Sequence, residues 1–284
     1  MHQDRRTFLR ALGVTSAAFA TGCKLKSLLG GSASEHTLGR IGIQLYTVRR
    51  QAATDLAGVL SQIAAIGYKE VEFAGYYNHS AADIRDMLRR NGLAAPSAHI
   101  AIEAIQNAPE RTFADARTIG HEWITVASLP RGSHVTPDDW KRVADQFNQA
   151  GSTVKAAGFR FAFHNHVDIF KKAGDFLPAD VLMKETDPSL VSFEMDLYWA
   201  VSSGADPIAM LDRFPGRFKM LHIKDGRPPY TDPSQTDVGA GTIDFKPILA
   251  RAKGIEHYFV ESDSAADPIR FAANSYRYLK NVQF

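Results

Sequence analysis

The stretch Gly158–Phe170, GFRFAFHNHVDIF, begins like a buried strand and ends in polar residues. Phe161–Phe163 supply the apolar run that a strand covered on both faces requires. His164 and His166 follow at alternate positions, so an extended chain places both imidazoles on one face. An apolar strand that ends in such residues is typical of a parallel sheet whose carboxyl end carries the chemistry of the protein.

The same pattern of a short apolar run followed by an amphipathic segment recurs along the chain. Eight strand-like runs are expected, at residues 41–48, 70–75, 95–102, 123–128, 160–166, 191–199, 219–226 and 257–263. Eight strand–helix units in about 245 residues predict an α/β fold, the parallel (β/α)₈ TIM barrel. The alternative, an open doubly wound sheet, would favour a glycine-rich turn after its first strand, and YTVRRQAATD at residues 46–55 contains none.

The N-terminal residues 1–23, MHQDRRTFLRALGVTSAAFATGC, are predicted to be an export signal. Arg5 and Arg6 precede a short, mildly apolar segment that resembles the twin-arginine type of signal. ATGC resembles a loose lipobox, which would make Cys23 the lipidated first residue of a mature chain. The expected partner is therefore the twin-arginine export machinery, and the expected location is the periplasm, with Cys23 as the membrane anchor. Residues 24–39 are predicted to be a flexible tether, and residues 40–284 a single catalytic domain.

Composition limits the classes of function. The 284 residues are 45% hydrophobic and 23% charged, with a formal net charge of +2. This balance gives no general attraction to nucleic acid, so no nucleic-acid partner is expected. The single cysteine excludes an internal disulfide framework.

Polar residues gather near the ends of the predicted strands, where a covered parallel sheet should be apolar. They are Glu72, His99, His164, His166, Glu194, Asp196, His222, Lys224, Asp225, Glu261 and Asp263. A single histidine at a strand end is more often structural than a ligand, but the barrel fold brings this whole set to one mouth. Buried ionised carboxylates are costly unless they are paired or bind a metal, so we expect a divalent cation there.

These residues resemble the sugar phosphate isomerase/epimerase superfamily, the xylose isomerase-like TIM barrels. The resemblance covers nearly all of the chain after Arg40. Its carriers are FHNH at 163–166, FEMDLYWAVSSGADP at 193–207, LHIKDG at 221–226, GAGTIDF at 239–245 and VESD at 260–263. For GAGTIDF a turn and a helix cap are the simpler explanation, and a phosphate-binding loop is the alternative.

The resemblance implies which residues form the site. It places one divalent cation on four ligands, His164, Asp196, His222 and Glu261, with His166 as the alternative to His164. Many related epimerases have a glutamate at the position of His164. Glu261 and His166 are the expected proton-transfer residues. The expected substrate-binding residues are Glu72, His99, Trp199 and Lys224.

The histidine at position 164 disfavours a symmetric epimerisation by two glutamates. The resemblance therefore implies an isomerase, epimerase, dehydratase or lyase that removes a proton next to the carbonyl of a sugar or keto-sugar, through an enediolate that a metal stabilises. Mixed nitrogen and oxygen ligands suit Mn²⁺, Co²⁺, Fe²⁺ or Zn²⁺, and loading before export favours Mn²⁺. The alternatives are an exported barrel that binds sugar without turnover and an endonuclease-like barrel. A homo-oligomer is an open alternative to a monomer.

Overall fold

The computed structural model describes residues 36–284, which form one compact unit. The predicted export signal, Cys23 and residues 24–35 of the predicted tether lie outside the described residues. His36 lies within the predicted tether, and its backbone exchanges two hydrogen bonds with that of Phe284, N···O 2.9 and 3.1 Å. Within residues 36–284, no helix has both the length and the apolar character needed to cross a membrane.

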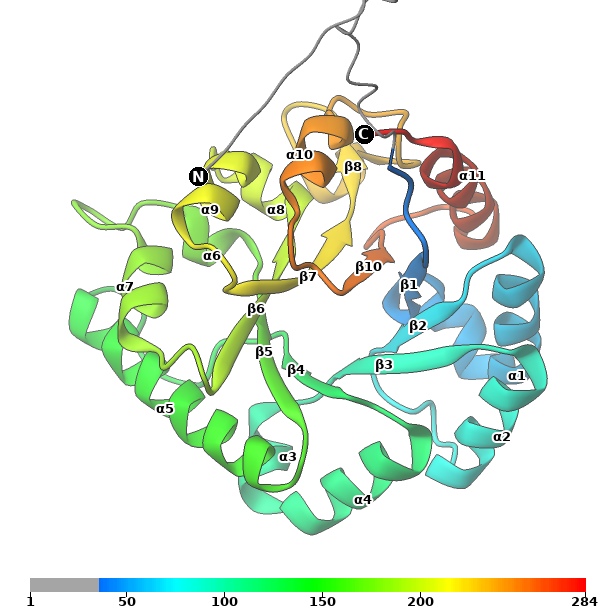
Figure 1. Ribbon diagram of the computed structural model, residues 1–284, viewed down its shortest axis with the longest axis horizontal. Coiled ribbons are helices and arrows are strands. Elements are labelled where there is room, and N and C mark those ends of the chain that lie inside the picture. Colours follow the sequence, from blue (N-terminus) through cyan, green and yellow to red (C-terminus); the bar gives the residue numbers. More distant parts are fainter. Residues whose placement is uncertain (1–35) are drawn as a thin grey trace, which may run out of the picture. The chain divides into compact units, whose positions relative to one another are not determined.

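Eight parallel strands close into a barrel, as the alternation predicted (Figure 1). Their order around the barrel is β1-β10-β7-β6-β5-β4-β3-β2, so neighbours in sequence are neighbours in space. The strands are β1 (Gly42–Gln44), β2 (Glu70–Phe73), β3 (Ala94–His99), β4 (Trp123–Val126), β5 (Arg160–His164), β6 (Val191–Asp196), β7 (Phe218–Ile223) and β10 (His257–Val260). Because all of them are parallel, their carboxyl ends meet at one mouth.

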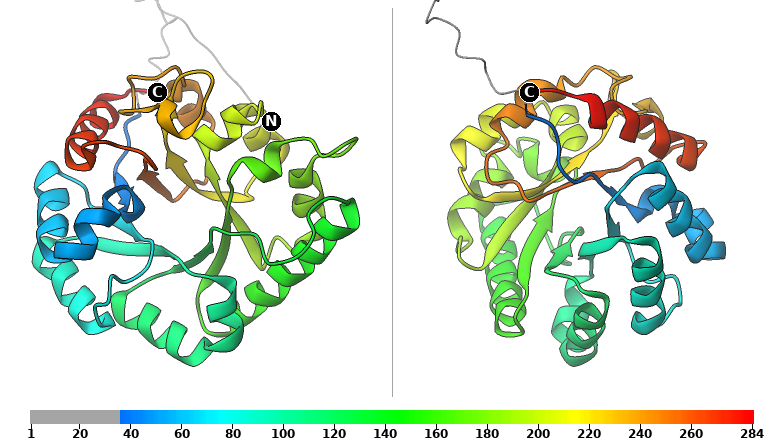
Figure 2. Two further views of the ribbon diagram at one scale, coloured as in Figure 1. Left: turned by 180° about the vertical axis from the view of Figure 1, so that it is seen from behind. Right: turned by 45° about the vertical axis from the view of Figure 1, so that its right-hand side comes forward.

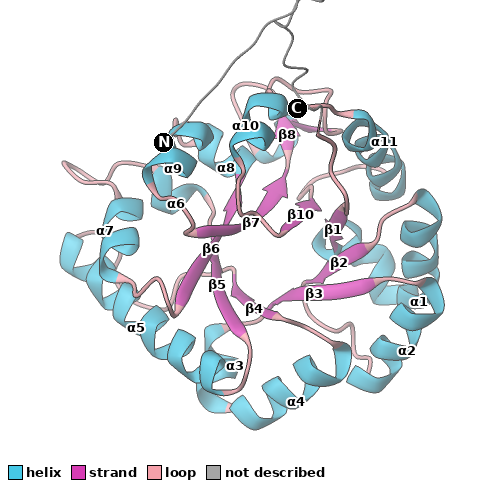
Figure 3. Ribbon diagram, viewed as in Figure 1, coloured by secondary structure: helices cyan, strands magenta, loops and turns pink. Residues whose placement is uncertain are grey.

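The helices surround the barrel, and the strands lie inside them in each view (Figures 2 and 3). The α-helices are α1 (Arg49–Ile66), α2 (Ala81–Asn91), α3 (Ile102–Asn107), α4 (Pro109–Ile119), α5 (Pro137–Ala156), α6 (Val167–Phe170), α7 (Pro178–Glu185), α8 (Leu197–Ser202), α9 (Pro207–Arg213), α10 (Phe245–Arg251) and α11 (Pro268–Asn281). Two 3₁₀ helices, η1 (Leu45–Val48) and η2 (Asp232–Ser234), and the short antiparallel pair β8 (Asp225–Gly226) and β9 (Gln235–Thr236) complete the described elements.

Local sequence signals explain where the helices begin. Thr136 caps α5 in a capping box with Asp139, and Pro137 occupies the first turn, where its missing N–H costs nothing. Ser80 caps α2, and Gly92 ends that helix in the left-handed conformation.

All eight barrel strands end two to four residues earlier than the sequence predicts, and at two of them a helix begins directly. Residues 45–48 form η1 instead of continuing β1, and the Gln44 side chain accepts a hydrogen bond from the Tyr46 N–H at this start. Residues 197–199 begin α8 instead of extending β6, because the Asp196 carboxylate accepts the Trp199 N–H at 2.9 Å and caps the helix. Both turns occur at the mouth, where they redirect polar side chains.

The amino-terminal end of the barrel is closed by side chains. Trp123, Ala162, Met220 and Phe259 form a small buried cluster inside it. Beside this cluster His257 Nδ1 lies 2.8 Å from the buried Glu70 carboxylate, which Arg40 also contacts at 3.5 Å. These side chains fill this end of the barrel, whereas a cavity lies at its carboxyl end, among the polar strand ends.

Candidate active site

The polar strand ends come together at the mouth of the barrel. Almost all of these side chains are less than 5% exposed: Glu72, His164, Glu194, Asp196, His222, Lys224 and Glu261. They come from β2, β5, β6, β7 and the chain that follows β7 and β10. Burying so many ionisable groups is costly without mutual pairing or a metal, so their arrangement decides what the site can do.

Four side chains place one ligand atom each in a common group. One nitrogen or oxygen from each of His164, Asp196, His222 and Glu261 lies within 4.8 Å of the others. These are the four residues that the family resemblance implied as metal ligands. His166 is not in the group, so the structure favours His164 over its neighbour as the donor from β5.

The environment of His222 shows which ring nitrogen faces that group. Its Nε2 lies 2.7 Å from Glu72 Oε2 and 3.2 Å from Glu194 Oε2, and its Nδ1 lies 2.9 Å from Glu261 Oε2. Carboxylates lie on both sides of the ring, so without a metal both nitrogens are protonated. Two carboxylates hold the proton on Nε2, so Nδ1, on the side of Glu261, is the nitrogen that would give up its proton to bind a metal. Burial alone would lower the pKa of His222, but Glu194 and Glu261 raise it well above its usual value.

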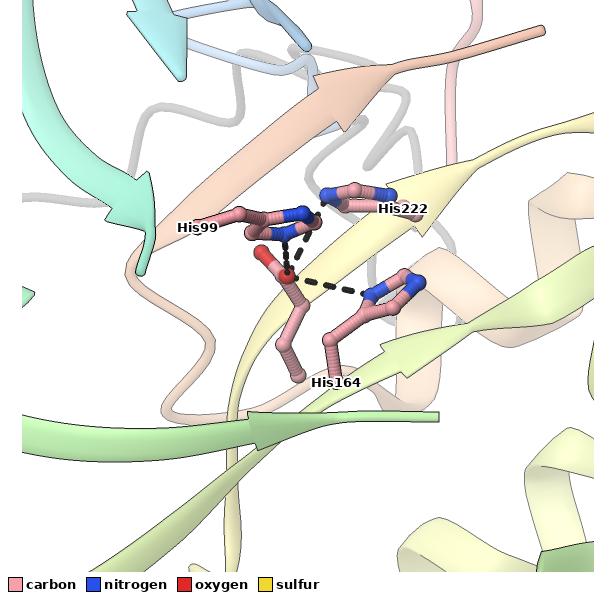
Figure 4. A group of neighbouring side chains, drawn as sticks. His99, His164 and His222 are labelled. Carbon is pink, nitrogen blue, oxygen red and sulfur yellow. Dashed lines mark hydrogen bonds and ion pairs between the residues drawn. The ribbon is translucent and has the colours of Figure 1, made fainter. Parts of the chain in front are cut away.

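One oxygen of Glu194 holds three imidazoles together. Glu194 Oε2 lies 3.1 Å from His99 Nε2, 3.1 Å from His164 Nδ1 and 3.2 Å from His222 Nε2. In Figure 4 the three labelled histidines point toward one another, and the dashed lines meet at this oxygen. Burial would raise the pKa of Glu194, but His222 and the other imidazoles lower it well below its usual value, so Glu194 is ionised.

Glu194 also belongs to a second group of potential donors. His99, His164, Glu194 and His222 likewise offer atoms within 4.8 Å of one another. This group would need His164 Nδ1 and His222 Nε2, the nitrogens that donate to Glu194 and Glu72. With those protons in place, the nitrogens that remain to bind a metal are His164 Nε2 and His222 Nδ1, so we assign the ligand group that contains Asp196 and Glu261.

Asp196 is positioned by its backbone as well as by its helix cap. The Asp196 N–H donates to Asn165 Oδ1 at 2.9 Å, and Asn165 Nδ2 donates to the Asp196 carbonyl at 3.4 Å. Asn165 thus ties the end of β5 to the end of β6. This explains the polar residue between the two histidines of FHNH.

Lys224 is a buried cation between carboxylates. Its Nζ lies 3.0 Å from Asp196 Oδ2 and 2.8 Å from both Glu261 Oε2 and Asp263 Oδ2. Burial would lower the pKa of Lys224, but Asp196 and the other carboxylates raise it well above its usual value, so it stays charged. Gln235 of β9 donates to the same Asp263 oxygen at 2.8 Å, which fixes this carboxylate.

The site fits a divalent cation by charge and by donor chemistry. Carboxylates outnumber the permanent cation, since Lys224 is the only lysine or arginine paired with the buried acids Glu72, Glu194, Asp196 and Glu261 among residues 36–284. Asp196 Oδ2 is also buried and has no hydrogen-bond partner within the described chain apart from its ion pair with Lys224. Two imidazole nitrogens and two carboxylate oxygens are a suitable ligand set for Mn²⁺, Fe²⁺, Co²⁺ or Zn²⁺.

A cavity of about 450 Å³ lies above the cluster. Its lining residues are Tyr46, Arg49, His99, Ala127, Ser128, His164, His166, Trp199, Asp232, Glu261 and Asp263. His99 and Trp199, both predicted to bind substrate, line this cavity, as does His166. The His166 side chain is exposed to the cavity. Partial desolvation at the cavity wall lowers its pKa, so its imidazole is neutral near pH 7 and can accept a proton.

Two predicted substrate-binding residues are not on the cavity wall. Glu72 is buried beneath the site, where it accepts hydrogen bonds from Gln44, Ser97 and His222 at 2.8, 2.5 and 2.7 Å. Lys224 is buried under Trp199, with Nζ 5.4 Å from the ring centroid. Both side chains are bonded to neighbouring charged or polar groups and do not line the cavity, which differs from the expected position of a substrate-binding residue.

Some wall residues were not predicted. Tyr46 and Arg49 come from η1 and the start of α1, and Asp232 comes from η2 in the excursion between β7 and α10. Nothing in the local sequence marks these residues as functional, since they reach the mouth only when the barrel closes. Glu194 did carry a signal, because it lies two residues before Asp196 and therefore on the same strand face.

Comparison with known proteins agrees with this geometry. The family described as xylose isomerase-like TIM barrel matches residues 60–262. The inosose dehydratase of Lacticaseibacillus casei is 30% identical over 167 residues, which cover 51% of this chain and 55% of that protein. The chain thus spans about half the length of the curated relatives it matches.

Solved structures give the same result. A sugar phosphate isomerase/epimerase from Parabacteroides distasonis superposes with a TM-score of 0.75 at 28% identity, covering 86% of this chain and 94% of that one. The IolI protein with a bound zinc atom has a TM-score of 0.68 at 14% identity over 84% of this chain and 95% of that one, which supports the fold. The chain belongs to the xylose isomerase-like TIM barrel family.

Proposed function

We propose that this protein is a divalent-metal-dependent enzyme that moves a proton next to the carbonyl of a sugar or cyclic polyol ketone. The observation that carries the proposal is the group of donor atoms from His164, Asp196, His222 and Glu261, within 4.8 Å of one another at the floor of the cavity. A divalent cation held there would act as a Lewis acid on substrate oxygens.

The proton-transfer groups are Glu261 and His166. Both line the cavity, and partial desolvation leaves the exposed His166 imidazole neutral and able to accept a proton. Burial would raise the pKa of Glu261, but Lys224 and His222 lower it well below its usual value, so Glu261 enters the reaction as a carboxylate. His222 and Lys224 both contact Glu261 Oε2, at 2.9 and 2.8 Å, and fix this oxygen.

The two sides of the site differ, which favours an asymmetric reaction. Glu261 and His166 both line the cavity, so the proposed proton-transfer groups are a carboxylate and an imidazole instead of two glutamates. One group can abstract the proton and a different group can protonate a leaving hydroxyl, as a dehydratase or β-eliminating lyase requires. Similarity to inosose dehydratases supports this branch, and similarity to sugar phosphate isomerase/epimerases supports the isomerase branch.

The cofactor proposal is one divalent metal, with Mn²⁺ as the preferred ion. The ligand set tolerates Co²⁺, Fe²⁺ and Zn²⁺ as well, and a structural neighbour binds zinc. Manganese is preferred on the further proposal that the protein folds and loads its metal before twin-arginine export to the periplasm. Metal analysis of protein recovered from its native compartment tests this, and zinc alone would contradict it.

The experiment for the proposed function is incubation of the metal-loaded protein with ketoses, inososes and 3-keto-glycosides in D₂O. We expect deuterium incorporation next to a carbonyl, and the product will separate isomerisation from elimination. Glu261→Gln is the variant to compare, because it keeps the size of the side chain but removes the base. Binding without any exchange would instead identify a sugar-binding barrel that does not turn its ligand over.

A further inference from the structure

The glycine-rich segment after β7 is wrapped around a carboxylate of the chain itself. Asp225 Oδ1 accepts the N–H groups of Gly226 and Ile243 at 2.8 and 3.3 Å. Asp225 Oδ2 accepts those of Gly239 and Gly241 at 2.9 and 3.0 Å. Four backbone N–H groups therefore converge on one buried anion, 1% exposed, which is the arrangement by which loops bind phosphate.

The segment is built for this internal anion. A Cβ at Gly241 would lie 2.1 Å from Asp225 Oδ1, so only glycine allows the backbone to approach so closely. Gly239 has φ +86°, a conformation that other residues rarely adopt. The alternative role predicted for GAGTIDF is a phosphate-binding loop. In the structure the carboxylate of Asp225 already occupies the amide groups that would bind the phosphate.

The amides that bind Asp225 lie in the loop after the seventh barrel strand. Barrels of this fold often bind phosphate with the loops that follow strands 7 and 8. Here the loop after the seventh barrel strand gives its amides to Asp225. The loop after the eighth, at β10, gives its carboxylate, Asp263, to Lys224 and Gln235 at 2.8 Å each. The exposed arginine of the loop after β7, Arg227, donates to the Ala240 carbonyl at 3.2 and 2.6 Å, so it too is engaged within the loop.

The charges on the cavity wall point the same way. Its ionised side chains outside the histidines are Arg49, Asp232, Glu261 and Asp263. Arg49 already donates to the carbonyls of Tyr46 and Asp263 at 2.7 and 2.9 Å. A phosphate on the substrate would therefore meet Asp232, the paired carboxylates of Glu261 and Asp263, and one arginine whose N–H groups already bond the backbone, although about 450 Å³ leaves room for it.

We infer that the site selects an uncharged sugar or polyol ketone and discriminates against its phosphate ester. This inference rests on the proposed function, because it names the substrate class of the same cavity. Asp225 occupies the backbone amides that could otherwise bind a substrate phosphate. The acidic side chains of the cavity wall disfavour a phosphate group on the substrate.

The test compares neutral and phosphorylated sugars on the metal-loaded protein. The probes are fructose with fructose 6-phosphate and ribulose with ribulose 5-phosphate, measured by deuterium exchange and by calorimetric binding. Since juxtaposed like charges cost several kcal/mol, we expect each neutral sugar to be favoured by at least about 100-fold. A phosphorylated member that exchanges or binds better than its neutral partner would overturn the inference.

A second arm does not depend on turnover. Inorganic phosphate is titrated into metal-free protein while the backbone amide signals of Gly239, Gly241 and Ile243 are followed by NMR. We expect these signals to stay unmoved to about 10 mM, well into the range of weak binding. Saturable shifts of these amide signals would contradict the inference, whether or not any sugar exchanges. Absence of sugar exchange without such shifts would count against the proposed function alone.

Arg49→Gln is the matched variant, because Arg49 is the one arginine or lysine among the described residues that line the cavity. We expect the ratio of neutral to phosphorylated binding to stay within about threefold of the unmodified protein, well under 1 kcal/mol. If the variant lost binding of the phosphorylated sugars, the ratio would change, and Arg49 would be shown to bind the phosphate group.

Discussion

Two buried groups of carboxylates and imidazoles lie at opposite ends of the same barrel. At the amino-terminal end, Glu70 is paired with His257 and Arg40, so one acid meets two basic partners. At the carboxyl end, four buried acids, Glu72, Glu194, Asp196 and Glu261, share one lysine, Lys224, and the imidazoles of His99, His164 and His222. The difference is one of charge: the first group has one arginine for one acid, and the second has one permanent cation for four acids, an excess of acid that a divalent cation would reduce.

The largest effect is expected from Asp196→Asn. This change removes one charged ligand, so we expect the bound metal to fall from one ion per chain to near none and turnover to be lost. Asparagine still caps α8, because its side-chain oxygen can accept the Trp199 N–H. Circular dichroism and metal analysis together check that the barrel folds without its ion.

Asp196→Ala is the control for that cap. It removes the ligand and the cap together, so it should unfold more easily than Asp196→Asn by about 1 kcal/mol. Full metal content in either variant would show that the ligand group is assigned incorrectly.

The second effect concerns the internal cation. Lys224→Met leaves Asp196, Glu261 and Asp263 without their ammonium, and removing one partner of a buried ion pair costs about 3–5 kcal/mol. We expect the metal-free variant to lose that much stability in urea titrations. Addition of metal should raise its Tm more than that of the unmodified protein, because the ion then neutralises the same carboxylates. An equal rise of Tm on metal addition in both proteins would show that Lys224 is not coupled to the metal site.

A third change acts on the metal through His222. Glu72 accepts the His222 Nε2–H at 2.7 Å and thereby directs Nδ1 toward the metal side. Loss of such a partner typically lowers metal affinity by about 10–100-fold, which is the decrease expected for Glu72→Gln in metal titrations. Unchanged affinity would mean that Glu72 has no influence on the orientation or basicity of His222.

The smallest effect on the site is expected from the opposite end of the barrel. Glu70→Gln weakens a buried hydrogen bond to His257 and should destabilise the fold by about 1–3 kcal/mol. Metal content and affinity should not change, because Glu70 belongs to the group at the amino-terminal end. If Glu70→Gln reduced metal affinity as strongly as Glu72→Gln, the contrast between the two ends would fail.

The sequence predicted the barrel because its strand pattern is local and repeated. Buried parallel strands are almost wholly apolar, so polar residues such as His164 and His222 stand out at their ends. The family resemblance then implied the four ligands, and the structure brings their donor atoms together. The pattern could not show how deeply each side chain is buried below the cavity. Glu72 and Lys224 were therefore expected on the cavity wall, although both lie beneath it.

Residues far apart in sequence were harder to predict. Tyr46, Arg49 and Asp232 reach the cavity through 3₁₀ turns and the β8–β9 excursion, whose short elements have no periodicity to detect. The role of GAGTIDF was also undetermined from sequence. Its amides meet Asp225, which precedes Gly239 by 14 residues, and only the folded loop shows that the anion is the protein's own.

The most direct test of the central proposal is a crystal structure of the metal-loaded protein with an anomalous difference map at the absorption edge of the metal. We predict one peak among His164, Asp196, His222 and Glu261, at about 2.0–2.2 Å from the donor atoms. A peak held instead by His99 and Glu194, or no peak among these strand ends under saturating metal, would contradict the account.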